Sequence, residues 1–315
     1  MKILAYLLTT SFLLLISGII VFFYGLWYFG KQLPDYKELS KYNPNVVTRI
    51  HAGNGALLAE YAIEKRVFVP INVIPKSVIN AFISAEDKEF YNHFGLDIKA
   101  TLRALLTNVK NIGSGKRLIG ASTITQQVAK NFLLTSEVSF ERKIKEAILA
   151  IRIERAFSKN QILELYLNEI YLGFKSYGVA AAALNYFDKS LDNLDLAESA
   201  FLAALPKAPN NYNPIHKTKN AVYRRNWVLN QMNKNGYIDK QTKEIESNKL
   251  INIRKSSGID EGYAPYFTEE VRKILSENKK IGSKLYTNGY SVRTTLDLLM
   301  QRYADNSLIN GLENL

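Results

Sequence analysis

The first thirty residues carry the longest apolar run of the chain. Residues 3–30 contain no charged side chain, and as a helix they would span about 42 Å, more than the roughly 30 Å hydrocarbon core of a bilayer. Tyr24, Trp27 and Tyr28 gather near the end of the run, where aromatic rings favour a membrane interface. The run is too long for a cleaved signal peptide, and no small-residue cleavage site follows it. We therefore predict a transmembrane anchor over residues 1–30.

The orientation of this anchor follows from what surrounds it. Only Lys2 and the amino terminus precede the apolar run. We expect this short stub in the cytoplasm and everything after Lys31 on the outer side of the membrane, as a single-pass protein.

The pattern after the anchor separates three further segments. Two strand-like runs joined by a Gly-Asn-Gly turn lie in residues 31–74 after a polar spacer, and they predict a β-hairpin. Helical spacing dominates from residue 75 onward, so we place the main domain, mainly α, at 75–250. Residues 251–315, with a strand-like GYSVRTTLD and another helix, are interpreted as a linker.

Several residues mark helix ends. Pro75 suits a first turn, and Ser158 with Gln161 forms a capping box before a helix for which Gly173 suits the C′ position. The basic stretch 111–120 interrupts the helices and predicts a mobile loop.

Charge and composition narrow the chemistry. The formal net charge is +12 and the isoelectric point is near 9.5, which favours an anionic partner. The chain has no cysteine, which excludes a disulfide scaffold, a thiolate zinc site and a cysteine nucleophile. Its three histidines lie far apart in the sequence, which argues against a histidine metal site.

Glu86 is the first candidate for catalysis. It lies four residues after Phe82 and four before Phe90, on an apolar stripe that also includes Val78, Ile79 and Ile83. A carboxylate in such a place is poised for proton transfer. The alternative, which spacing alone leaves open, is a buried glutamate satisfied by an internal arginine.

Two further segments carry candidate binding groups. In GASTITQQVAKN, Ser122 is the expected N-cap, and it falls with Gln126 and Lys130 on one helical face that suits sugar hydroxyls and phosphate oxygens. The alternative is an ordinary solvated face. In residues 140–157 an apolar stripe of Ile144, Ile148 and Ile151 accompanies Glu146, which follows Arg142 and Lys143 closely enough for a cationic pocket or a surface ion pair.

Five segments, taken in order, resemble the five motifs of the family 51 peptidoglycan glycosyltransferases. They are EDKEFYNHFGLD, GASTITQQVAKN, RKIKEAILA, ILELYLNEIYLG and LAESAFLAALPKAPNNYNP. The resemblance covers about residues 45–280, and the anchor and trailing GYSVRTTLDLLMQ are similar to class A penicillin-binding proteins. It implies a lysozyme-like glycosyltransferase domain, with 251–315 leading toward a transpeptidase domain that is absent from this chain. The string Ser276–Lys279 is interpreted as chance, so no penicillin-acylated serine is expected.

The resemblance implies polymerisation of lipid II into β-1,4 glycan strands, with inversion and release of undecaprenyl pyrophosphate. Glu86 matches the base, and Glu146 matches the second catalytic glutamate, near the leaving group. A divalent metal, Mg²⁺, is implied by the family, with Glu146 as its candidate ligand. The implied partners are lipid II, lipid-linked glycan, the cytoplasmic (inner) membrane and other cell-wall synthesis proteins, and not nucleic acid. The matching substrate-binding positions are Asp87, Ser122, Thr123, Gln126, Gln127, Lys130, Asn131, Arg142 and Lys143.

Two departures from the family pattern bear on these expectations. Val138 occupies a position that is basic in many relatives, so one pyrophosphate contact is expected either to be missing or to be supplied from elsewhere, with Lys116 and Arg117 of the loop as candidates. Asp188 replaces the glycine of a Y-F-G-K string, and because aspartate tolerates left-handed backbone we expect only a local change.

Three other functions stay open. A lysozyme-like muramidase would cleave finished glycan instead of making it. A membrane-tethered nucleic-acid or scaffold protein would account for the charge alone. An inactive truncated copy of a bifunctional penicillin-binding protein would keep the motifs without turnover.

Overall fold

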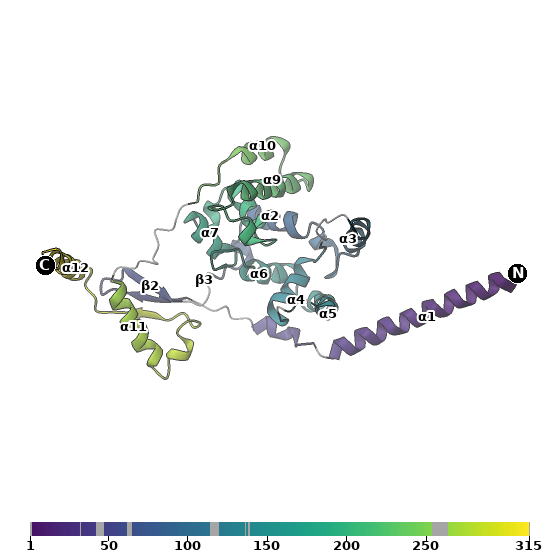
Figure 1. The fold of residues 1–315 in the computed structure, drawn as a ribbon, viewed down its shortest axis with the longest axis horizontal. Helices are drawn as coiled ribbons and strands as arrows, with labels where there is room; N and C mark the ends of the chain where they lie inside the picture. Colours follow the sequence, from purple (N-terminus) through teal and green to yellow (C-terminus); the bar gives the residue numbers. More distant parts are fainter. Residues whose placement is uncertain are drawn as a thin grey trace. The chain divides into compact units, whose positions relative to one another are not determined.

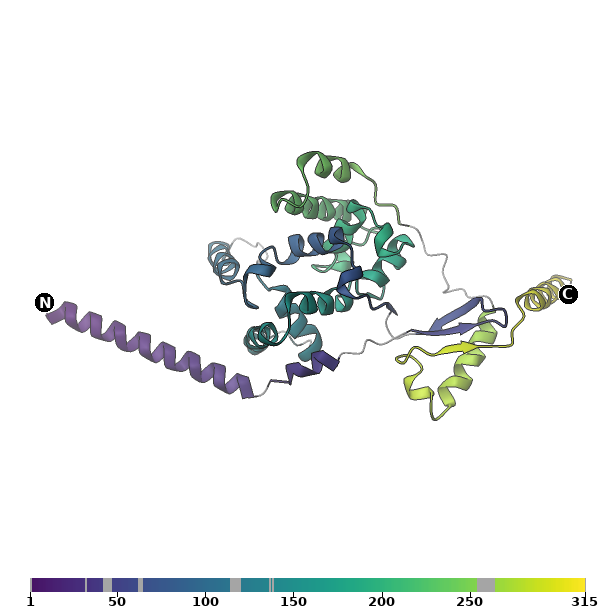
Figure 2. The same cartoon turned by 180° about the vertical axis from the view of Figure 1, so that it is seen from behind.

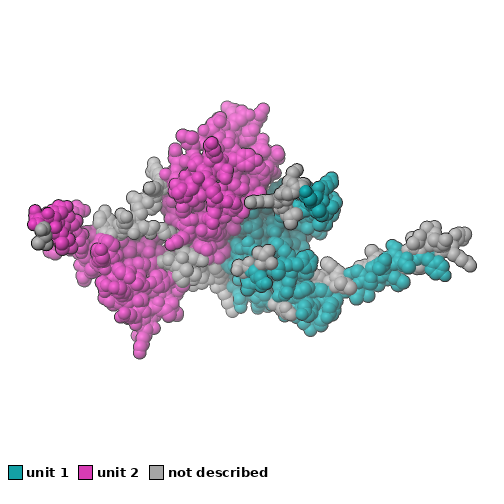
Figure 3. Space-filling model, viewed as in Figure 1, with its two compact units in different colours: residues 1–42, 86–166 teal, residues 43–85, 167–315 magenta. Residues whose placement is uncertain are grey.

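A computed structural model shows a mainly helical protein, as the sequence predicts (Figures 1 and 2). It divides into two compact units, residues 1–42 with 86–166 and residues 43–85 with 167–315 (Figure 3). The residues that the structure describes are 2–31, 33–41, 47–61, 65–113, 120–135, 137, 139–253 and 264–314.

The first unit begins with α1 (Lys2–Lys31), which Figure 1 shows as one continuous helix. The helix predicted over the apolar run is therefore confirmed. Across the described part of the chain, no helix meets both the length and the apolar character of a membrane span. The anchor accordingly stays a prediction. The unit's other helical elements are η1 (Tyr36–Lys41), η3 (Phe90–Asn92), α3 (Ile98–Lys110), α4 (Ile124–Leu133) and α5 (Phe140–Ala156).

Two helices cross the boundary between the units along the chain. The last residue of α2 (Lys76–Glu86) and the first part of α6 (Lys159–Glu169) belong to the first unit. The predicted capping box of α6 is confirmed, because the side-chain oxygen of Gln161 accepts from the Ser158 amide at 2.8 Å and the Ser158 hydroxyl accepts from the Gln161 amide at 3.3 Å.

The predicted hairpin is confirmed in the second unit. Strands β1 (Thr48–His51) and β2 (Leu57–Tyr61) pair antiparallel, with an irregularity at the end of β1. The second strand is shorter than predicted, since β3 (Lys65–Arg66) pairs in parallel with β4 (Ser176–Tyr177) instead.

The segment interpreted as a linker is folded where the structure describes it. Strand β5 (Ser291–Arg293) pairs in parallel with β1, which gives the sheet order β2-β1-β5. Phe267, Val271 and Leu275 of α11 (Pro265–Glu277) pack against a core formed by the hairpin. The strand and the helix predicted near the end of the chain are confirmed as β5 and α12 (Leu298–Glu313). The described residues of the segment interpreted as a linker are folded because they cover the apolar face of the hairpin. That core consists of Ile50, Ala52, Leu58 and Ala59.

Among the remaining helices of the second unit, α7 and α8 bury many small residues. Helix α8 consists largely of buried alanine, serine and leucine and lies against α9. The helices are α7 (Val179–Phe187), α8 (Leu196–Ala204), α9 (Thr218–Lys234), α10 (Lys240–Asn248) and α12 (Leu298–Glu313), and the short 3₁₀ turns are η2 (Ile71–Val73), η4 (Leu191–Asn193), η5 (Pro209–Asn211) and η7 (Gly282–Lys284).

Two predictions about backbone conformation had different outcomes. Asp188 ends α7 in the left-handed region, at φ 55° and ψ 41°, so the expected local accommodation is confirmed. Gly173 is not the C′ residue of α6, which ends at Glu169. The chain leaves the helix early because Tyr171 pairs with Tyr177, and Gly173 turns the chain between them at φ 88°.

Candidate active site

Glu86 is the last residue of α2 and is half-buried. Val78, Phe82 and Ile83 of the predicted stripe are buried, but Phe90 begins a separate turn, so the stripe does not continue past Glu86 as one helical face. The Nε2 of Gln127, on α4, donates to Glu86 Oε2 at 2.9 Å. This contact brings the predicted base and a predicted substrate-binding residue together.

Asp87 joins the end of α2 to the start of α4. Its side chain is only 3% exposed, and Oδ2 accepts from the Ile124 amide at 2.9 Å. Nε2 of His93 lies 3.0 Å from both carboxylate oxygens. Because both oxygens are engaged inside the protein, the prediction that Asp87 contacts substrate is not supported. It positions α4 instead, at the positive end of the helix dipole.

The first turn of α4 is capped one residue later than predicted. Thr123, not Ser122, is the N-cap, and its hydroxyl accepts from the Gln126 amide at 3.2 Å. The side-chain oxygen of Gln126 accepts from the Thr123 amide at 2.9 Å, which completes a capping box. Thr123 is 2% exposed, so its expected contact with substrate is replaced by a structural role.

Gly95 brings the loop that contains His93 into close contact with the backbone of α5. Its φ is +89°, and a Cβ built there would lie 2.7 Å from the backbone carbon and oxygen of Ala150. Its carbonyl accepts from the Thr123 hydroxyl at 2.6 Å. Only glycine combines this backbone conformation with so close an approach.

Glu146 is buried among cations. Its side chain is 1% exposed, and Oε1 lies 3.1 Å from the Nε of Arg142. The Nζ of Lys143 donates to Oε2 of Glu146, and also lies 3.2 Å from the hydroxyl of Ser122. The buried position of Glu146 therefore favours the cationic pocket over the surface ion pair.

The face of α5 that is buried differs from the predicted stripe. Ile144, Ile148 and Ile151 are only half-buried. Because Glu146 faces inward, the buried face of α5 is rotated about the helix axis from the face that the isoleucines predict. The buried residues are Glu146, Leu149, Ala150 and Ile153.

Lys130 completes the cluster. Burial lowers its pKa, the negative charge of Glu146 opposes this shift, and the positive charges of Arg142 and Lys143 lower the pKa further. The negative charge of Glu86 also raises the pKa of Lys130, so this lysine feels the charges of both glutamates. Three cations thus share the site with two carboxylates, which leaves a positive excess suited to a phosphate-bearing ligand.

The structure brings most of the predicted site residues together, but not Asn131, and it does not describe three of the residues named in the sequence analysis. Asn131 is exposed on α4. Val138, Lys116 and Arg117 lie outside the described residues. The residues joined by the contacts above are Glu86, Ser122, Gln127, Lys130, Arg142, Lys143 and Glu146.

The surroundings of Glu146 do not fit a divalent cation. Arg142 and Lys143 already engage its two oxygens. Within the described ranges, no three histidine, aspartate or glutamate side chains gather closely enough to hold a metal ion. We therefore derive no step that requires a metal at this residue.

Sequence reasoning missed two buried groups. Tyr166 of α6 is 1% exposed, and burial raises the pKa of its phenol well above the ordinary value, with the charges of Glu86 and Asp87 adding to the rise. Glu154 accepts from the Thr125 hydroxyl at 2.6 Å and from Lys159 Nζ at 2.7 Å. A tyrosine among the buried leucines of α6 was a usable signal. Glu154 had none, since its partners come from other helices.

Replacing Gly95 with alanine is expected to destabilise the protein by about 2–5 kcal/mol, because strain at positive φ costs about 1–2 kcal/mol and overlap with α5 costs about 1–3 kcal/mol. Gly55→Ala is the matched control, since Gly55 has φ +87° but nothing within 4 Å of a built Cβ. It should lose only the strain, about 1–2 kcal/mol. Denaturant unfolding measures both, and equal losses would contradict the close approach.

Lys130→Met is expected to lower activity at least a hundredfold without lowering the melting temperature. A lysine with a lowered folded-state pKa binds its proton more weakly when folded, so its contribution to stability rises with pH between that pKa and the ordinary 10.5. The variant should lack this rise. Thermal unfolding from pH 7 to 10 measures it, and a large loss of stability at pH 7 would contradict the assignment.

Comparisons with known proteins agree with this geometry. Penicillin-binding protein 1A of Rickettsia bellii (strain RML369-C) is 48% identical over 304 residues, 96% of this chain and 38% of the relative. Penicillin-binding protein 1A of Aquifex aeolicus (strain VF5) is 43% identical over 299 residues, 95% of this chain and 40% of the relative. The chain thus spans about two fifths of the length of these curated relatives.

A solved structure and a family profile complete the comparison. The crystal structure of Penicillin-Binding Protein 1A from Haemophilus influenzae matches with a TM-score of 0.51 and 28% identity, over 84% of this chain and 29% of that chain. The profile of the transglycosylase family matches residues 54–233, which include every residue of the cluster described above. The chain belongs to the transglycosylase family.

Proposed function

We propose that this chain is a peptidoglycan glycosyltransferase that polymerises lipid II into β-1,4 glycan strands and releases undecaprenyl pyrophosphate, in bacterial cell-wall synthesis. The observation that carries the proposal is the junction of a half-buried Glu86 with the cationic cluster around Glu146. The relatives named above are penicillin-binding proteins, which agrees with such a role.

The base side of the reaction is assigned to Glu86. An α-linked pyrophosphate replaced by a β-1,4 glycosidic bond inverts the anomeric centre in one displacement. The proton of the acceptor 4-hydroxyl passes to Glu86 while the hydroxyl oxygen attacks the anomeric carbon and the bond to pyrophosphate breaks. Gln127 fixes the orientation of the Glu86 carboxylate by its hydrogen bond to Oε2.

The leaving-group side is assigned to Lys130, Arg142 and Lys143. Glu146 holds Arg142 and Lys143 in place before substrate arrives, so these donors need no reorganisation as charge develops on pyrophosphate. Pyrophosphate next to Lys130 would favour its charged form and so offset the cost of burying it. Glu146 is thus a positioning group in this proposal.

The same geometry separates synthesis from hydrolysis. We infer a lysozyme-like domain from the family resemblance, and a muramidase of that kind places a second carboxyl group beside the scissile bond. Here the second carboxylate, Glu146, is 1% exposed and occupied by two cations. This arrangement favours departure of an anion over attack by water.

The anchor gives the site its location in this proposal. Residues 3–30 would cross the cytoplasmic membrane with the amino terminus inside. The carbonyl of Gly30, at the end of α1, accepts from Nη2 of Arg152 at 3.3 Å. Arg152 follows Glu146 by six residues on α5, about 9 Å along the helix axis. The cluster would therefore lie close to the interface where a lipid-linked substrate is held.

Helix α3 supports the same placement. Its apolar side chains at i, i+3, i+4 and i+7 spacing are each more than half exposed, and basic residues occupy its other faces. Such a helix suits the boundary between headgroups and acyl chains. The exposed apolar residues are Ile98, Leu102, Leu105, Leu106 and Val109.

Glu86→Gln should reduce polymerisation of lipid II at least a thousandfold and leave lipid II binding within about threefold, because the amide keeps the shape but cannot accept the proton. Glu89→Gln is the matched control, three residues later with a side chain 44% exposed, and should retain activity. Gel analysis of glycan strands measures turnover. Substantial polymer from Glu86→Gln would falsify the base assignment, and cleavage of finished glycan by the wild type would favour the muramidase.

Leu102→Asn with Leu106→Asn should slow polymerisation several-fold when lipid II is embedded in vesicles, since the apolar face of α3 would lose its contact with lipid. In detergent, where no bilayer must be engaged, the rate should stay near that of the wild type. Leu184→Asn, at a residue 42% exposed on α7, is the control. An equal loss in both media would count against membrane contact by α3.

A further inference from the structure

A partly buried lysine that the proposed reaction does not use lies at the start of α6. Lys159 is the first residue of that helix, and its ammonium group makes three contacts inside the first unit. Nζ donates to the carbonyl of His93 at 2.7 Å and to Oε1 of Glu154 at 2.7 Å. It also lies over the Phe90 ring, 4.5 Å from the ring centre. One ammonium group thus joins α6 to α5 and to the turn that begins with Phe90.

The turn that Lys159 contacts is bonded twice to Asp87. The amide of Phe90 donates to the Asp87 carbonyl at 3.0 Å, and Nε2 of His93 lies 3.0 Å from both carboxylate oxygens of Asp87. Among the described residues, Nδ1 of His93 is buried and has no hydrogen-bond partner. The ring therefore carries its proton on Nε2, because a buried N–H at Nδ1 would be left unpaired. Its orientation depends on this one side-chain contact and on the position of the His93 backbone.

Glu154 keeps the ammonium group of Lys159 in place. The side chain of Glu154 is 3% exposed, and the oxygen that accepts from Lys159 also accepts from the hydroxyl of Thr125, on α4, at 2.6 Å. Hydrogen bonds from a charged donor are stronger than those from a neutral one. The His93 carbonyl is therefore held by a charged donor whose own position is fixed by groups on α4 and α5.

We propose that Lys159 is a positioning residue for the reaction and acts on Glu86 through His93 and Asp87. A shift of the His93 backbone would turn the ring and disturb the carboxylate that holds the Ile124 amide, and so move the neighbouring Glu86 relative to α4. A displacement of about 1 Å at a reacting group can cost about a hundredfold in rate. This inference rests on the proposed function, in which Glu86 is the base.

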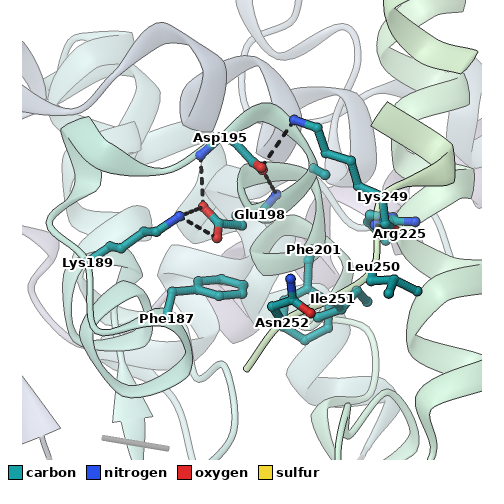
Figure 4. A pocket seen from close by; sticks show the side chains of 11 residues that line it. Phe187, Lys189, Asp195, Glu198, Phe201, Arg225, Lys249, Leu250, Ile251 and Asn252 are labelled. Atoms are coloured by element: carbon teal, nitrogen blue, oxygen red, sulfur yellow. Dashed lines mark hydrogen bonds and ion pairs between the residues drawn. The ribbon is translucent and has the colours of Figure 1, made fainter. Parts of the chain in front are cut away.

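A matched ion pair in the second unit supplies the control. Lys189 lies 2.7 Å from Oε1 of Glu198, at the edge of a pocket by the end of α7 (Figure 4). The side chains of Lys189 and Glu198 are 32% and 16% exposed, compared with 21% and 3% for Lys159 and Glu154. In the described part of the chain, the hydrogen bonds of Lys189 go only to Glu198. Lys189→Met therefore removes a similar ion pair without touching His93.

The first test compares Lys159→Met with the double variant Lys159→Met, Glu154→Gln, using the full chain in detergent. The single variant leaves a buried carboxylate without its cation and should melt at a lower temperature, whereas the double variant removes both charges and should recover most of the loss. In both variants kcat for polymerisation of lipid II should fall about a hundredfold with KM within about threefold, since only positioning is lost. Lys189→Met should retain the wild-type kcat.

A merely structural role gives a different result. If Lys159 only stabilised the fold, kcat would recover together with the melting temperature in the double variant, and this outcome would overturn the proposal. An equal loss of kcat in Lys189→Met would overturn it as well.

The second test needs no turnover. The chain has three histidines, His51, His93 and His216, so labelling the histidine ring nitrogens gives an NMR spectrum in which each ring can be followed. Lys159→Met and the double variant should shift the His93 signals alone, and Lys189→Met should shift none. A wild-type chain that makes no polymer would refute the proposed function but not the contact with His93. His93 signals that stay unchanged would overturn the positioning role, whatever the activity.

Discussion

The buried carboxylate of Asp87 is the contact on which the candidate active site depends. It holds the amide of Ile124 and so fixes the first turn of α4 against the end of α2. Glu86 is its neighbour in sequence, and α4 carries Gln127 and Lys130. The hydrogen bond between Asp87 and the Ile124 amide therefore helps to fix the position of Glu86 relative to Lys130. A buried carboxylate is tolerated at this position because both of its oxygens have polar partners, the Ile124 amide and the His93 ring.

The cationic cluster differs from Asp87, because not all of its charges are compensated by a direct contact that the structure shows. Glu146 compensates Arg142 and Lys143, but Lys130 is left partly buried beside charges of its own sign. A core optimised for stability alone would not place an ammonium group there. In the proposed reaction, an anionic leaving group next to Lys130 would offset this cost. Stability and activity thus oppose each other at this lysine.

The sequence predicted the parts of the fold that local signals decide. The long first helix, the hairpin, the capping box of α6 and the left-handed Asp188 all follow from spacing and propensity. The errors occur where a distant partner decides. Gly173 does not cap α6, because Tyr171 pairs with Tyr177 and the helix ends earlier. The segment interpreted as a linker forms β5 and α11, whose apolar residues pack against the hairpin core. At the site, the motifs identified Glu86 and Glu146, but no periodicity could show that Asp87 faces inward.

A comparison of the capping boxes of α8 and α4 shows why the inward orientation of Asp87 could not be predicted from the sequence. Helix α8 begins with Asp195 and Glu198, which supply negative charge to the helix end from within its own first turn. Helix α4 begins with Thr123 and a glutamine, which are neutral, and receives its carboxylate from Asp87, thirty-seven positions away from the amide that it binds. A locally charged cap makes a helix end independent of its surroundings. A neutral cap completed by a remote acid makes the helix end depend on docking, and here docking is what brings Gln127 to the proposed base. The neutral box at α4 therefore couples formation of the site to formation of the fold.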